Sequence, residues 1–512
     1  MALGTSWSVA LVGLEGHVVR VEADLATGIP GLTVTGLPDA SLSEARDRIK
    51  AAVLNSGGTW PGGKRITIGL SPASLPKRGS GFDLALAAAV LAGVDDSPAF
   101  PASALAGTVL LGELGLNGSV RRVTGVLPAL LSVRDRFARA VVPVANLAEA
   151  RLVPGLEVHG VRSLRDLVQL LRGERLDEVD VPPVALSAPP EVGDYVDVAG
   201  QPTGRQACEI VAAGGHSLLM TGPPGCGKTL LAERLPSVLP PLSMADSLEV
   251  TAVHSIADAL PAETLVSRPP FQAPHHSSTA AALIGGGSGV ARPGAVSLAH
   301  RGVLFLDEAP EFSTRVLDCL RQPLEKHEVV LQRVLGTATY PCRFTLVMAA
   351  NECPCAKPLS RCTCPPNQRR TYLSRLSGPL MDRVDLNVKM AAISKADVLH
   401  DKGGETSAEI AARVENARET AALRYEGTPW STNGDVPAVE LQARWPLSRE
   451  ARRPLMAAMD SGQLTARGYG RVQRVAWTVA DLAGHAAPTV EDAAVALFLR
   501  LGDTAASGTW VA

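Results

Sequence analysis

Residues 222–229 have the types and spacing of a loop that binds phosphate. They fit the pattern G-x-x-x-x-G-K-[ST], in which small residues let successive backbone N–H groups curl around phosphate oxygens. An apolar run at 217–221 precedes the loop and a helical pattern at 229–235 follows it, so the loop lies at a helix N-terminus, where anions are favoured. Lys228 then reaches the β- and γ-phosphate oxygens and the Thr229 hydroxyl binds Mg²⁺. We therefore predict ATP and Mg²⁺ as ligands. The predicted nucleotide-binding residues are Gly222, Pro223, Pro224, Gly225, Cys226, Gly227, Lys228, Thr229 and Asp307.

Two further strand ends carry side chains suited to hydrolysing a bound triphosphate. Asp307 and Glu308 follow the apolar run 302–306, and a parallel sheet brings such strand ends to one edge, beside the phosphate loop. Asp307 would complete the Mg²⁺ shell, and Glu308 would orient and deprotonate the attacking water. Asn351 ends the run 344–350, where its amide would polarise that water; the alternative is an ordinary turn residue.

Arg383 lies in the segment 376–386, where a neighbouring subunit's nucleotide could meet it. A guanidinium placed on a developing phosphoryl transition state accelerates transfer strongly. The alternative is a surface ion pair with Asp382 or Asp385. We predict the catalytic role.

Four thiols lie within twelve residues directly after Asn351, as two C-x-C pairs. Two thiolate pairs can close a tetrahedral Zn²⁺ site, which would order a loop this rich in proline. The spacing is tighter than that of most zinc ribbons, and free thiols are the alternative; an intracellular compartment disfavours disulfides. The predicted zinc ligands are Cys353, Cys355, Cys362 and Cys364.

The 512 residues predict several domains that together position these groups. Residues 1–175 alternate short strands, including 8–14 and 18–21, with helices at 41–56 and 82–92, which indicates an α/β domain. Residues 176–195 are rich in proline and predict a linker. Residues 196–393 predict a parallel-sheet core with the cysteine insert at 353–364, and residues 394–512 a helical domain with helices at 407–425, 448–461, 468–483 and 490–500.

Charge and hydropathy restrict the partners. The net charge of −2 provides no bulk basic field, so any nucleic-acid contact must be local. The longest uncharged apolar run, 84–94, is too short to span a bilayer. No basic stretch with a long apolar core marks a secretory signal, so we expect a cytoplasmic protein without membrane contact.

The phosphate loop, the segments 274–277, 285–287 and 293–312, and the segment 464–482 together resemble the YifB/ComM family of magnesium-chelatase-like AAA+ ATPases. The resemblance implies an AAA+ P-loop core and a C-terminal helical lid. It implies that Asn351 is the sensor-1 residue, Arg383 a finger acting in trans, and Arg467 the sensor-2 arginine, with Arg471 and Arg474 as rivals. It also implies an insertion at about 268–300 and a hairpin at 328–340, both facing a ring pore. Lys326 and Arg333 are then candidate pore contacts, with ordinary solvated charges as the alternative.

The first domain resembles the Lon-protease domain through residues 76–83 and 112–127. That family uses a serine and a lysine as a catalytic dyad. Here the serine position falls on Gly81 and the lysine position near Leu127, while Ser80 sits one place early and Lys77 is a poor replacement base. We therefore expect a Lon-like domain without peptidase chemistry.

By this resemblance the protein is an ATP-hydrolysing homo-hexameric ring motor that moves single-stranded or branched DNA, as a branch-migration helicase working with recombination proteins. A chelatase-type motor that remodels a partner protein is the alternative, because both classes use the same nucleotide site. An ATP-dependent protease ranks last, since the dyad is missing.

Overall fold

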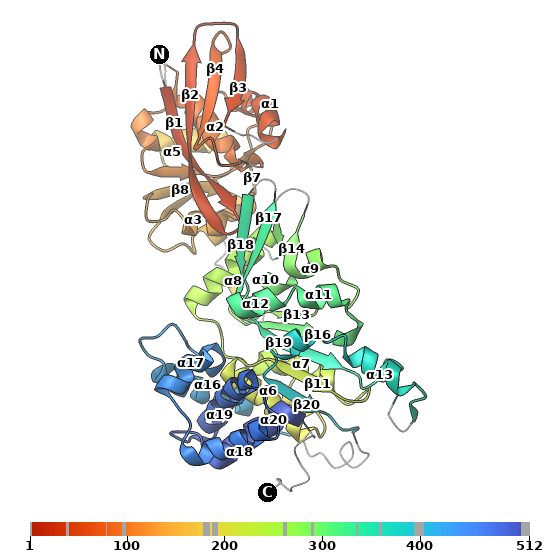
Figure 1. Ribbon diagram of the computed structural model, residues 1–512. Coiled ribbons are helices and arrows are strands. Elements are labelled where there is room, and N and C mark those ends of the chain that lie inside the picture. Colours follow the sequence, from red (N-terminus) through yellow and green to blue (C-terminus); the bar gives the residue numbers. More distant parts are fainter. Residues whose placement is uncertain are drawn as a thin grey trace.

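The computed structural model describes residues 3–36, 40–77, 79–94, 99–177, 185–186, 193–259, 264–287, 291–333, 336–357, 361–393 and 404–502. Within these ranges the N-terminal domain lies at one end, the parallel-sheet core in the middle and the C-terminal helices at the other end (Figure 1). Most of the predicted linker 176–195 and residues 394–403 fall outside the described ranges. No helix among the described residues combines the length and apolarity needed to cross a bilayer.

In the described part of the N-terminal domain, a four-stranded and a three-stranded sheet surround a buried helix, α2 (Asp83–Ala92), and β6 (Glu113–Leu114) pairs separately with β7 (Val120–Arg121). Residues 83–91 of α2 are all buried, which explains why its sequence is apolar on every side. The first strand begins five residues before the predicted 8–14, where small polar residues hide the apolar alternation, and ends two residues earlier. The second extends beyond the predicted 18–21 on both sides, because charged residues interrupt its apolar alternation. The first sheet has the order β1 (Leu3–Val12), β2 (Glu15–Ala26), β4 (Arg65–Ser71), β3 (Gly31–Thr35), and the second β5 (Thr108–Leu110), β8 (Arg139–Pro143), β9 (Glu157–Val161).

The core sheet is fully parallel and confirms the predicted fold class. Its three central strands are short, almost entirely buried apolar runs, as expected for a parallel sheet covered by helices, while its two edge strands are partly exposed. The order is β13 (Phe271–Gln272), β16 (Val303–Leu306), β19 (Thr345–Ala350), β11 (Leu218–Thr221), β20 (Leu386–Lys389). The helices α6 (Pro202–Gly214) and α7 (Lys228–Val238) pack against it.

The C-terminal region is helical, and four of its helices begin and end within two residues of the predicted positions. The fifth, α17, carries too short an apolar pattern to be recognised in the sequence. The helices are α16 (Ser407–Arg424), α17 (Ala438–Arg444), α18 (Arg449–Asp460), α19 (Ala466–Ala483) and α20 (Val490–Leu501). Buried residues of α16, α18, α19 and α20 belong to the same apolar cluster as the core sheet.

Both predicted insertions form hairpins. In the first, the short strands β14 (Gly285–Gly286) and β15 (Arg292–Pro293) pair between α9 (Ala280–Ile284) and α10 (Ala295–Leu298). In the second, β17 (Glu328–Arg333) pairs with β18 (Gly336–Pro341). This second hairpin points toward the N-terminal domain (Figure 1).

The N-terminal domain contacts the middle of the hairpin β17–β18 through its β1–β2 turn. Gly13 has φ +66°, and a Cβ there would lie 2.7 Å from the Thr339 carbonyl oxygen, so both the turn and the contact require glycine. Leu14 packs on the apolar cluster that includes Leu331 and Tyr340. A second contact runs through α8 (Met244–Ala257), where Ser255 donates a 3.1 Å hydrogen bond to Glu149.

Candidate nucleotide site

The phosphate loop joins β11 to α7, as the sequence predicts. Gly225 and Gly227 have φ values of +75° and +90°, which residues with a Cβ rarely adopt. The Lys228 amine donates to the carbonyl oxygens of Gly222 at 2.8 Å and Pro223 at 2.9 Å. Because α7 begins at Lys228, the loop amides and the positive end of the helix face the same point. The loop therefore fits a nucleotide's phosphates.

The carboxylates at the end of β16 lie beside this loop. The Thr229 hydroxyl donates to Asp307 at 2.9 Å, so the two predicted Mg²⁺ ligands meet. Asp307 also accepts the Glu308 N–H at 2.9 Å. Glu308 is left-handed, with φ +49° and ψ +43°, a conformation that costs about 1–3 kcal/mol and is found at functional sites. This turn separates the two carboxylates, leaving Glu308 available for a water.

His276 is a site residue that sequence reasoning left unassigned. Its Nδ1 lies 3.5 Å from a carboxylate oxygen of Glu308. His276 follows β13 and Glu308 follows β16. Because these two strands are paired, the residues after them lie close together. The Pro-His-His-Ser sequence at 274–277 was visible, but nothing in it indicated a carboxylate partner.

Asn351, at the end of β19, also reaches the loop. Its side-chain oxygen accepts a 3.2 Å hydrogen bond from Lys228. Its N–H donates to the hydroxyl of Tyr372 on α13 (Pro366–Leu373). Burial, together with the charges of Glu311 and Glu308, raises the pKa of Tyr372 to about 12, so the phenol stays neutral. Tyr372 is a second contact that the sequence did not reveal.

The four predicted zinc ligands converge between Asn351 and α13. Their sulfur atoms all lie within 4.8 Å of one another. Cys353 Sγ lies 3.2 Å from Cys362 Sγ and 3.5 Å from Cys355 Sγ, and the last two are 3.6 Å apart. A tetrahedral Zn²⁺ with bonds of about 2.3 Å sets its sulfurs about 3.8 Å apart. The cluster therefore fits Zn²⁺ with small adjustments.

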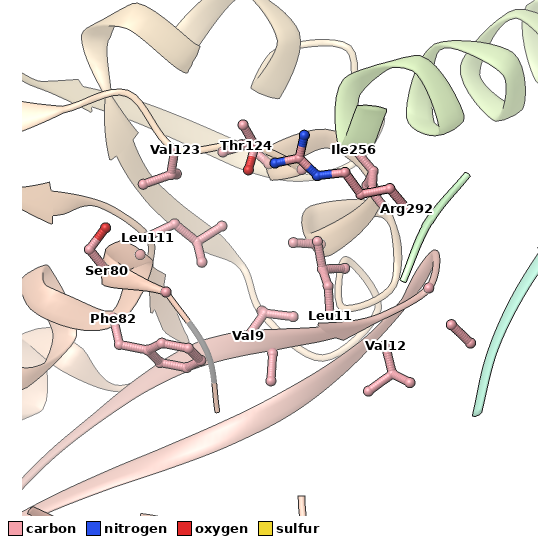
Figure 2. A pocket seen from close by; sticks show the side chains of 18 of the residues that line it. Val9, Leu11, Val12, Ser80, Phe82, Leu111, Val123, Thr124, Ile256 and Arg292 are labelled. Atoms are coloured by element: carbon pink, nitrogen blue, oxygen red, sulfur yellow. The ribbon is translucent and has the colours of Figure 1, made fainter. Parts of the chain in front are cut away.

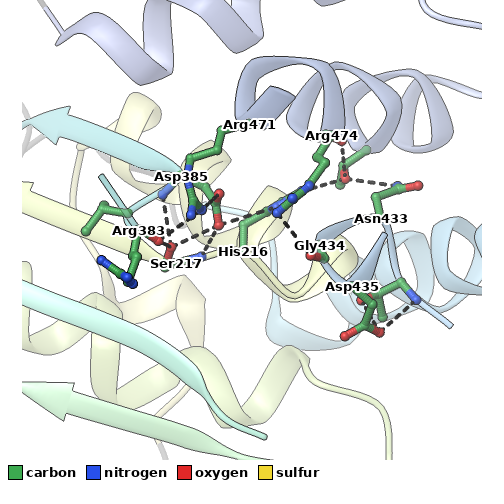
Figure 3. A network of polar contacts seen from close by, with 12 residues as sticks. His216, Ser217, Arg383, Asp385, Asn433, Gly434, Asp435, Arg471 and Arg474 are labelled. Carbon is green, nitrogen blue, oxygen red and sulfur yellow. Dashed lines mark hydrogen bonds and ion pairs between the residues drawn. The ribbon is translucent and has the colours of Figure 1, made fainter. Parts of the chain in front are cut away.

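The predicted arginines occupy different environments. Arg383 is ion-paired with Glu325 and donates to the Pro379 carbonyl. The Arg467 side chain is 80% exposed and lies 3.6 Å from Asp382, next to Arg383. Its two rivals already have partners: Arg471 binds Asp385 of the core at 2.5 Å, and Arg474 donates to the Gly434 carbonyl within the lid at 3.4 Å (Figure 3). Arg467 therefore stays the predicted sensor 2.

The serine position of the Lon-like dyad lies by a cavity of about 450 Å³ between the N-terminal domain and the core (Figure 2). Gly81 and Ser80 line it, but the Ser80 hydroxyl donates to Glu113. Lys77 is fully buried, and its amine donates to the carbonyls of Gly36, Leu70 and Pro72. A lysine that donates three hydrogen bonds is an ammonium ion, which has no lone pair and cannot act as the base for a serine.

Three family models match this chain in sequence. The model described as magnesium chelatase, subunit ChlI, matches residues 194–398. The model of subunit ChlI of Mg-chelatase matches residues 21–146, and the model of the ChlI C-terminal part matches residues 404–500. With the parallel sheet and its phosphate loop, these matches define a magnesium-chelatase-like AAA+ protein.

Sequence identity to proteins of similar length places the chain in one family within this class. The chain is 50% identical to an uncharacterised protein of Mycobacterium tuberculosis over 508 residues, covering 98% of this chain and 99% of that one. It is 38% identical to YifB of Escherichia coli and 37% identical to the competence protein ComM of Haemophilus influenzae, each over 94% of both chains. The chain belongs to the YifB/ComM family of magnesium-chelatase-like AAA+ proteins. A shorter match, 28% identical over 188 residues, is to Lon protease of Salinispora arenicola and covers 23% of that protein.

Proposed function

We propose that this protein is one subunit of a cytoplasmic, homo-hexameric ATPase that moves DNA and drives branch migration together with recombination proteins. One observation carries the ATPase: Lys228, Thr229, Asp307 and Asn351 meet around one phosphate loop, with Thr229 bonded to Asp307 and Lys228 to Asn351. Lys228 and the loop amides would hold the ATP phosphates, Thr229 and Asp307 the Mg²⁺, and Glu308 the attacking water.

The arginines support assembly into a ring. The contacts of Arg383 and Arg467 are with Glu325, Pro379 and Asp382, none of which belongs to the phosphate site. In our proposal these two neighbouring cations serve the nucleotide of the adjacent subunit. The site is then complete only between two protomers.

The choice of DNA rests on the family and on local charge. ComM, which matches over 94% of this chain, is named a competence protein, and we extend a role in handling incoming DNA to this protein. Lys326 is exposed at the base of the hairpin β17–β18; the Arg333 side chain lies outside the described residues. Since the net charge is −2, DNA binding would concentrate at such positions and weaken steeply with salt.

We further propose that Cys353, Cys355, Cys362 and Cys364 bind a structural Zn²⁺. The cluster begins two residues after Asn351 and ends two residues before α13, whose Tyr372 accepts the Asn351 N–H. A closed Zn²⁺ site would fix both ends of this segment and thereby the position of the Asn351 amide.

Remodelling of a partner protein is the alternative, favoured by the family models named for magnesium chelatase. Proteolysis is disfavoured by the environments of Ser80 and Lys77 described above.

The deciding experiment measures ATP turnover alone and with single-stranded, forked and four-way-junction DNA. Stimulation by junctions supports branch migration, and turnover indifferent to every DNA supports protein remodelling. Lys228→Ala should abolish nucleotide binding or turnover, while Glu308→Gln should bind ATP without hydrolysing it. Normal turnover in either variant contradicts the assigned site.

A further inference from the structure

The main chain of residues 383–385 is held from two sides. The Arg383 carbonyl accepts hydrogen bonds from the Ser217 hydroxyl at 2.8 Å and from Arg471 at 3.1 Å. The Val384 carbonyl accepts one from Arg500. Ser217 precedes β11 of the core, whereas Arg471 lies on α19 and Arg500 on α20 of the lid. Both lid helices therefore grip the segment that carries Arg383.

The side chain of Asp385 lies between Arg471 of the lid and Ser217 of the core and binds both (Figure 3). One carboxylate oxygen is 2.5 Å from Arg471, and the other accepts the Ser217 N–H at 2.9 Å. Burial alone would raise the pKa of Asp385, but the positive charges of Arg471 and Arg474 and the hydrogen bond from the Ser217 N–H hold it well below its usual value. The carboxylate is thus ionised, only 6% exposed and paired, and removing one partner of such a pair is costly.

The Arg383 side chain, in contrast, has exchangeable partners. The Arg383 side chain is 17% exposed, but that of its ion-pair partner Glu325 is 61% exposed, so water can replace the carboxylate and the pair is weak. The main chain at this position is therefore fixed while the guanidinium can change partners. That combination suits a group that must be aimed at a second subunit.

We propose that Arg471, Arg500 and Asp385 are positioning residues, which fix the main chain of Arg383 to the lid so that both trans-acting arginines are presented as one unit. Arg467 and Arg471 lie four residues apart on α19 and so share a helix face. One end of that face binds the Arg383 carbonyl, and the other lies 3.6 Å from Asp382. This inference rests on the proposed role of Arg383.

The test uses subunit mixing with the full-length protein. Arg471→Met should lower turnover of the assembled particle by on the order of 100-fold if the guanidinium shifts by about 1 Å. Mixing it with Glu308→Gln should restore activity, because the Glu308→Gln subunit supplies an intact finger to the intact site of its neighbour. Arg471→Lys should keep part of the activity, since a single nitrogen of Arg471 makes both contacts.

Two further variants keep the result interpretable. Ser217→Ala removes one bond to the Arg383 carbonyl and should show a smaller loss with the same recovery on mixing, even if Arg471→Met assembles poorly. Arg413→Met is the matched control: it breaks another ion pair between lid and core, to Glu209 at 2.6 Å, remote in sequence from residues 383–385, and should turn over ATP normally.

Two outcomes overturn the inference. Normal turnover by assembled Arg471→Met does so, as does a loss that mixing fails to restore while Arg383→Ala is restored. Normal turnover by Arg383→Ala alone would instead refute the finger assignment itself.

Discussion

Acidification should loosen the joint between lid and core through His216. This side chain is fully buried, and burial lowers its pKa to about 4, against about 6.5 in an unfolded chain. Because the folded pKa is the lower one, the contribution of His216 to stability is complete above pH 6.5 and is lost as the pH falls toward 4. By linkage, the loss between pH 7 and pH 5 is about 2 kcal/mol of the free energy of unfolding.

Titration of Asp385 does not overlap the range between pH 7 and pH 5 in which His216 acts. Its pKa is depressed, so its contribution is present above the ordinary value of about 3.9 and is lost only at lower pH. Burial also lowers the pKa values of His254 and His327. Their effect on stability is the same in the wild-type protein and in a His216 variant. The difference between the two proteins isolates His216.

The assay is urea unfolding at pH 7, 6 and 5, followed by tryptophan fluorescence. In the described part of the lid, Trp430, Trp445 and Trp477 belong to one apolar cluster, and their fluorescence should report unfolding of the lid. The His216→Gln variant retains an amide that can bond Thr478, the 2.7 Å partner of the imidazole. Wild type should lose about 2 kcal/mol more than this variant between pH 7 and pH 5. Equal losses would refute a neutral, buried His216.

Three other predictions concern the nucleotide site. Removing zinc, or replacing Cys362 by Ser, should slow ATP hydrolysis while ATP binding persists, because Asn351 loses its fixed position; elemental analysis well below one zinc per chain in active protein contradicts this. His276→Ala should lower turnover by roughly two- to fivefold, the value of a partly exposed ion pair, with unchanged binding of ATP; unaltered turnover removes His276 from the site. Glu325→Gln should free Arg383 and lower the protein concentration needed for half-maximal ATPase by about two- to fivefold, and an unchanged concentration dependence argues against the ion pair as a competitor.

Local motifs and strand ends were predictable because they depend on near neighbours in the chain. The phosphate loop, Asp307 and Asn351 each follow an apolar run, and a parallel sheet necessarily gathers such ends. The lid helices were predictable from their 3.6-residue periodicity.

Contacts that depend on how the units dock were not predictable. Arg471 meets Asp385 across 86 residues, and nothing near either residue indicates the other. Among the three candidate sensor-2 arginines, Arg467 is distinguished from Arg471 and Arg474 only by its exposure in the folded protein, which the sequence does not reveal. His276 approaches Glu308 because β13 lies next to β16. A strand of two residues is too short to be predicted from the sequence, so this pairing was not predictable.

The glycine turn pressed against Thr339 has a mechanical implication. Since a Cβ at Gly13 would lie 2.7 Å from the Thr339 carbonyl oxygen, a tilt of the hairpin β17–β18 would press directly on the main chain of the N-terminal domain. Because α8 holds the same domain through Ser255 and Glu149, such a movement would shift the N-terminal domain as a body and not the hairpin alone.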